Sequence, residues 1–195
     1  MATIIVGGHA RNVGKTSFVA ALIKSFHCYP WTAVKISSHW HQEEKTGNAA
    51  DGSPCFVFEE TDSAGHSDSS RYLAAGARRS LWVRVREDRW AGAVEVLSPL
   101  LCSEPFLIVE GNNALRFLTP DLYVLVMDYG VEDFKESALD NLGRVDAAIA
   151  MKYRPGRIWA SVPPEPLEHL TLFHTDHPGK IPRQFIDFAR TKLNI

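Results

Sequence analysis

Two continuous apolar runs, residues 106–109 and 122–127, constrain the fold of this chain more than any other feature. Strands that are buried on both faces have such sequences, and they are typical of a parallel sheet covered by helices on both sides. Further strands are predicted at residues 3–7, 32–37, 55–59, 81–85, 147–151, 158–162 and 169–174, and helices at 14–27, 68–77, 90–101, 134–142 and around 185–192. This alternation predicts an α/β fold with three layers, in which helices flank a mostly parallel central sheet.

Composition narrows the class of protein further. A chain of 195 residues with 45% hydrophobic residues is long enough to bury a core, and we expect one domain over residues 1–195. The formal net charge of −2 argues against broad nucleic-acid binding. No apolar run approaches the roughly 20 residues that span a bilayer, so no membrane partner is expected. Three scattered cysteines form no disulfide framework, which favours a cytoplasmic protein with reduced thiols.

The most informative motif is the glycine-rich segment at residues 7–17, between a predicted strand and a predicted helix. Backbone N–H groups of such a turn can point at phosphate oxygens, and the helix adds the positive end of its dipole. Lys15 would supply a charge to the β- and γ-phosphates, and the Thr16 hydroxyl would ligate Mg²⁺. The predicted nucleotide-binding residues are Gly8, His9, Arg11, Asn12, Val13, Gly14, Lys15, Thr16 and Ser17.

The spacing of this motif departs from the usual G-x-x-x-x-G-K-[ST] pattern. The first glycine of that pattern would fall on His9, and Gly8 leaves five residues before Gly14 instead of four. The alternative is a glycine-rich turn with a chance Gly-Lys-Thr, but the flanking strand and helix favour a phosphate loop.

Charged residues at strand ends extend the candidate site. Glu110 follows an apolar strand, where it could hold Mg²⁺ directly or through water; the alternative is a carboxylate that faces solvent. Asp128 ends the next strand and is more typical of a turn. Lys35 lies inside an apolar strand and therefore needs a partner, such as a phosphate or an acidic substrate. Alternatively, Lys35 protects an edge strand from aggregation.

Three further residues complete the candidates. His39 and His41 flank Trp40 after the second strand, where substrate contact or loop structure is favoured over zinc binding because no third ligand is evident. Asp68 either caps a helix or has a catalytic or metal-linked role. Residues 42–60 are polar and form a long loop, with a strand at 55–59, and long loops are often functional.

Four segments of the chain resemble the MobB-type proteins of molybdopterin-guanine dinucleotide biosynthesis, which are P-loop proteins of the SIMIBI class. They are Val-Gly-Lys-Thr at 13–16, Val-Lys-Ile-Ser-Ser-His at 34–39, Asp-Ser-Ser-Arg-Tyr-Leu-Ala-Ala-Gly-Ala at 68–77 and Leu-Ile-Val-Glu-Gly at 107–111. The resemblance implies a homodimeric, GTP-preferring protein with weak hydrolysis, acting as an adaptor for a molybdenum-cofactor biosynthesis protein. Within it, phosphate binding is carried by Gly14, Lys15, Thr16 and Ser17, the Mg²⁺-linked acid is Glu110, and Lys35, His39 and Asp68 match positions of less certain role.

The loop spacing and its Val-Gly-Lys-Thr ending also resemble dethiobiotin synthetase. That resemblance implies an ATP-dependent ligase or kinase that phosphorylates a small carboxylate or carbamate, with Lys35 orienting the substrate. A third reading is a nucleotide-dependent switch whose loop at 42–60 meets a partner protein. Only the lysine of the guanine-recognition pattern Asn-Lys-x-Asp is present, as Lys152, so the choice between GTP and ATP stays open. The predicted catalytic residues are Lys15, Lys35, Asp68 and Glu110, with Thr16 and Glu110 as the metal-linked pair.

Overall fold

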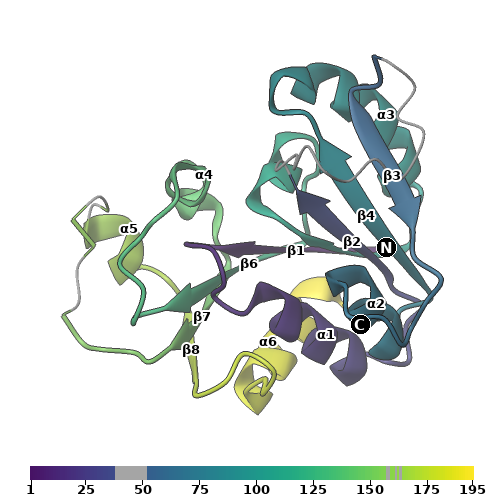
Figure 1. Ribbon diagram of the computed structural model, residues 1–195. Helices are drawn as coiled ribbons and strands as arrows, with labels where there is room; N and C mark the ends of the chain where they lie inside the picture. The colour runs from purple at the N-terminus through teal and green to yellow at the C-terminus, as the bar shows by residue number, and fades with distance from the viewer. Residues whose placement is uncertain (38–51, 157–158, 161, 163) are drawn as a thin grey trace.

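The computed structural model describes residues 1–37, 52–156, 159–160, 162 and 164–195 (Figure 1). Its described part contains one sheet of eight strands in the order β3-β4-β2-β5-β1-β6-β7-β8. The strands are β1 (Ala2–Gly8), β2 (Thr32–Ser37), β3 (Cys55–Glu59), β4 (Arg79–Val85), β5 (Phe106–Glu110), β6 (Leu122–Asp128), β7 (Ala147–Met151) and β8 (Leu172–Thr175). All neighbours pair in parallel except β3, which runs antiparallel to β4. The predicted mostly parallel sheet is therefore confirmed.

Helices cover both faces of this sheet, which confirms the three-layer α/β fold. The helices are α1 (Lys15–Ser25), α2 (Asp68–Ala74), α3 (Trp90–Cys102), α4 (Glu136–Leu139), α5 (Pro164–Glu168) and α6 (Arg183–Leu193). In Figure 1, α1, α2 and α6 lie together on one side, whereas α3 lies on the other. Successive residues of a strand point to opposite faces. Accordingly, Ile4 of β1 joins the core beneath α1, whereas Ile5 joins the core beneath α3.

Two predicted elements differ from the structure, and one helix was not predicted. The helix expected at 134–142 is reduced to α4 and a 3₁₀ turn at Leu142–Arg144. The strand expected at 158–162 is wrong for the residues that are described there: the Trp159 indole instead donates to the Val131 carbonyl at 2.9 Å. Helix α5 was not predicted; it begins at Pro164, and proline is tolerated in a first helical turn.

Strand β2 lies inside the sheet, between β4 and β5. The alternative that Lys35 protects an edge strand is therefore wrong, and its charge needs another explanation. Among the residues that the structure describes, no helix is long and apolar enough to cross a membrane.

Candidate functional site

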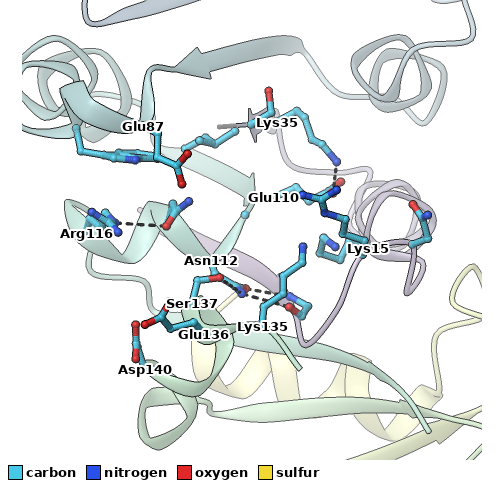
Figure 2. A pocket seen from close by; sticks show the side chains of 18 of the residues that line it. Lys15, Lys35, Glu87, Glu110, Asn112, Arg116, Lys135, Glu136, Ser137 and Asp140 are labelled. Carbon is cyan, nitrogen blue, oxygen red and sulfur yellow. Dashed lines mark hydrogen bonds and ion pairs between the residues drawn. The ribbon is translucent and has the colours of Figure 1, made fainter. Parts of the chain in front are cut away.

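The carboxyl ends of β1, β2 and β5 open into a cavity of about 970 Å³ (Figure 2). Crevices at the carboxyl edge of a parallel sheet are the usual ligand sites of α/β proteins. Ten charged residues of both signs line the cavity, some from the predicted site and others from segments that the sequence did not indicate. Its residues include Gly8, Arg11, Asn12, Lys15, Lys35, Glu110, Asn112, Lys135, Glu87, Trp90, Asn113 and Arg116.

The loop between β1 and α1 exposes a row of backbone donors. The N–H groups of residues 12–17 donate no hydrogen bond to any part of the chain that the structure describes. Asn12 and Gly14 have positive φ angles of 58° and 85°, which accommodate the extra residue of this loop. A Cβ atom on Gly14 would lie 2.4 Å from Pro178, so only glycine fits there. Unpaired N–H groups before a helix are well suited to bind an anion.

Lys15 is the cation of this loop. Its ammonium donates to the Ala10 carbonyl at 3.2 Å and forms no ion pair within 4 Å in the described part of the chain. Burial lowers the pKa of Lys15 to about 8; the charge of Glu110 opposes this shift, and the charges of Lys135 and Lys35 add to it. A half-buried ammonium that has no carboxylate in direct contact is stabilised when an anionic ligand binds beside it.

The pKa of Lys15 predicts how its removal changes stability with pH. The folded protein releases this proton near pH 8 and the unfolded chain near 10.5, so the buried charge destabilises the fold below pH 8. We expect Lys15→Met to raise the free energy of unfolding by about 1–2 kcal/mol at pH 7, with the gain disappearing between pH 8 and 10.5. Urea unfolding at a series of pH values measures this difference, and the exposed Lys24→Met is the control. A gain that does not change with pH would contradict the assignment.

Glu110 is the centre of the polar contacts. It is 1% exposed and lies at the end of β5. Its Oε2 atom accepts a hydrogen bond from the Thr16 hydroxyl at 2.9 Å and another from the Tyr72 hydroxyl, and its Oε1 atom pairs with the Lys35 ammonium. The alternative that Glu110 faces solvent is therefore wrong. This carboxylate instead connects β5 to the start of α1, to Tyr72 of α2 and to β2.

Asp68 completes the ionic group on the other side of Lys35, at 2.9 Å. Burial alone would raise the pKa of Asp68, but the hydrogen bond and charge of Lys35, a hydrogen bond with Thr16 and the charge of Arg71 together outweigh it, so the pKa is lowered. The cap of α2 is the Ser67 hydroxyl, which accepts from the Ser70 N–H, so the alternative that Asp68 caps this helix is wrong. Asp68 is therefore available for the site.

The residues predicted as metal-linked fit a hard divalent cation. A hydroxyl and a carboxylate in contact, Thr16 and Glu110, are oxygen donors of the type that Mg²⁺ prefers. Within the described residues, no three His, Cys, Asp or Glu side chains are arranged to hold a metal. Mg²⁺ is usually held by one or two carboxylates together with substrate phosphates.

Several predicted residues do not present their side chains to the cavity. The His9 ring is fully buried between Phe134 and Trp159, and the Val13 side chain is buried, so both contribute backbone only. The Ser17 hydroxyl accepts from Arg71 at 2.9 Å. Asp128 pairs with Lys152 and accepts the Gly130 N–H at 2.8 Å, as expected of a turn residue. His39, His41 and residues 42–51 of the long loop lie outside the described residues.

Three residues at the site were missed by the sequence analysis. Tyr72 was read as part of a helical segment, yet its buried hydroxyl contacts Glu110. Asn112 forms two hydrogen bonds with the backbone of Gly8, at 3.0 and 3.2 Å, and so holds the end of β1. Lys135 lines the cavity from the segment before α4. Only Asn112 had a usable signal, because it stands two residues after the candidate acid.

No family model matches this chain, and no curated protein matches it. What the protein does must therefore be inferred from the chemistry of the cavity.

Proposed function

We propose that this protein binds a nucleoside triphosphate with Mg²⁺ and hydrolyses it slowly. One observation carries the proposal. The N–H groups of residues 12–17 have no acceptor in the described part of the chain, Asn12 and Lys15 of this loop line the cavity together with Glu110, and Glu110 accepts a hydrogen bond from Thr16. A polyphosphate with a bound metal ion requires N–H donors and a cation for its oxygens, and oxygen ligands for the metal. This site contains groups of all three kinds.

The position of each residue indicates its role in binding. The loop N–H groups and Lys15 would bind the phosphates, and Thr16 and Glu110 would hold Mg²⁺, which neutralises developing charge when it is bound. Lys35 is held between Glu110 and Asp68, so its position is fixed before any ligand arrives. A cation fixed in advance can stabilise negative charge in a transition state without further reorganisation.

The resemblance of four segments to MobB-type proteins supports a biological role for this activity. We propose a GTP-favouring adaptor in molybdenum-cofactor biosynthesis, acting as a homodimer on a partner protein. Lys15, Lys35 and Glu110 come from three of the four matching segments and line the cavity. Asp68 and Tyr72 of the fourth segment contact Lys35 and Glu110.

A second candidate function is favoured by the size of the cavity. At about 970 Å³ it is at the upper end of the range of about 300–1,000 Å³ for small-molecule sites, and it continues past the loop to Trp90 and Arg116. This leaves room for a small acid beside the phosphates. The alternative is therefore an ATP-dependent ligase or kinase that phosphorylates a carboxylate or carbamate, as in dethiobiotin synthetase.

A thermal-shift panel tests the proposal. ATP, GTP and their diphosphates are added with and without Mg²⁺, and a ligand at 100 times its Kd should stabilise the fold by about 2.7 kcal/mol. We expect the largest shift for a triphosphate with Mg²⁺; no shift with any nucleotide would refute the proposal. Turnover separates the two roles, because an adaptor hydrolyses slowly regardless of added small molecules, whereas a ligase consumes ATP only with its acid substrate.

A further inference from the structure

Lys135 brings a third ammonium group to the cavity from a separate part of the chain. Figure 2 shows its side chain rising from below toward the space near Glu110 and Lys15, while Lys35 approaches Glu110 from above. Lys15 follows β1 and Lys35 lies in β2, whereas Lys135 immediately precedes α4. Cations from three segments of the chain therefore face one space.

The backbone that carries Lys135 is tied to the phosphate loop. The Lys135 N–H donates to the His9 carbonyl at 2.7 Å, which is a direct link between the two loops. Asn112 adds a second link, because its amide bonds to the Gly8 backbone and also donates to the Ser137 hydroxyl at 3.2 Å. The backbone position of Lys135 is thus fixed relative to the loop that would hold the phosphates.

The charge of Lys135 has no counter-ion in the described part of the chain. No carboxylate there lies within 4 Å of its ammonium, although the group is half-buried. Its charged neighbours are the cations Arg11 and Lys35 and the acids Asp133 and Glu110, and Lys15 is also affected by its charge. Glu110 is already engaged by Lys35. A half-buried cation with no carboxylate in direct contact, and with other cations nearby, is stabilised when an anionic ligand binds beside it.

We propose that Lys135 binds the terminal phosphate of the bound triphosphate and is the residue by which the site distinguishes a triphosphate from a diphosphate. This inference rests on the proposed nucleotide binding. The loop N–H groups and Lys15 surround the anion from the side of α1, whereas Lys135 reaches the same space from the side of α4. A diphosphate held by the loop would leave Lys135 unpaired, and only a longer phosphate chain would meet it.

The test measures the ratio of diphosphate to triphosphate Kd. Titration calorimetry with Mg²⁺ compares ATP with ADP and GTP with GDP for the wild type, Lys135→Ala, Lys135→Arg and the exposed control Lys24→Ala. We expect Lys135→Ala to weaken triphosphate binding about 10-fold or more while diphosphate binding changes less than about 3-fold. Lys135→Arg should restore most of the preference, and Lys24→Ala should match the wild type. A merely structural role would weaken both ligands alike.

The outcomes distinguish the role of Lys135 from the proposed nucleotide binding on which it depends. If the wild type binds nucleotide and Lys15→Ala does not, but Lys135→Ala keeps the wild-type ratio or weakens both nucleotides equally, only the role of Lys135 is overturned. If the wild type binds no nucleotide, the proposed function fails and the role of Lys135 fails with it.

Discussion

Lys15→Ala is expected to lose nucleotide binding by at least about 100-fold, or about 3 kcal/mol, while the protein stays folded. The Lys15 ammonium is half-buried and makes no ion pair in the described part of the chain, so its charge is directed to a ligand and not to the fold. Hydrogen bonds from a charged group contribute about 1.5–3 kcal/mol each, and an ammonium can make several. Titration calorimetry with a triphosphate and Mg²⁺ measures the loss.

Lys24→Ala is the matched control, because Lys24 lies in the last turn of the same helix and is exposed. It should bind nucleotide as the wild type does. The thermal midpoint of unfolding of Lys15→Ala should equal or exceed that of the wild type, which excludes misfolding as the cause. Normal nucleotide affinity in Lys15→Ala would overturn the assignment of the phosphate site.

Glu110→Ala is expected to have two effects, on stability and on metal dependence. Removing one partner of a buried ion pair costs about 3–5 kcal/mol, because the other partner is left without its counter-charge. The variant leaves Lys35 with Asp68 alone and leaves the buried Tyr72 hydroxyl without its acceptor. For a chain of this size we expect the midpoint of unfolding to fall by roughly 10 °C. Nucleotide binding should also lose most of its dependence on Mg²⁺.

Glu104→Ala separates these two effects. Glu104 is another buried carboxylate, paired with Arg78 at 2.7 Å and Arg79 at 2.6 Å, but it stands just before β5, at the opposite end of the strand from Glu110. Both variants should be destabilised, and only Glu110→Ala should change a Mg²⁺ titration of nucleotide binding. A Mg²⁺ titration that is identical in Glu110→Ala and the wild type would show that this carboxylate does not serve a metal.

Most of the fold could be predicted from the sequence, because apolar runs and helical periodicity are local properties. The interior strands β5 and β6 could be located within about one residue from their lack of charge. Between residues 134 and 172 only β7 could be located; the short helical elements around it could not. There, proline and glycine weaken the local preference, and contacts distant in sequence, such as Trp159 with Val131, determine the path of the chain.

The candidate site could likewise be predicted only in part. Parallel strands bring their carboxyl ends together, so the proximity of Lys15, Lys35 and Glu110 could be expected from strand assignments alone. Lys135 could not be found in this way. It reaches the cavity through a backbone hydrogen bond between two loops, and any residue type with an N–H group can form such a bond. The contact of Tyr72 with Glu110 was not predicted, because an aromatic residue in a helix usually packs in the core.

The contact between Lys35 and Glu110 suggests an order of ligand arrival. An ammonium already neutralises the carboxylate, so a divalent ion that arrives alone must compete with an internal cation. A triphosphate changes this balance, because its oxygens offer the lysine another partner and the ion additional ligands. Metal and nucleotide should therefore bind cooperatively, and each should raise the affinity for the other by the same factor.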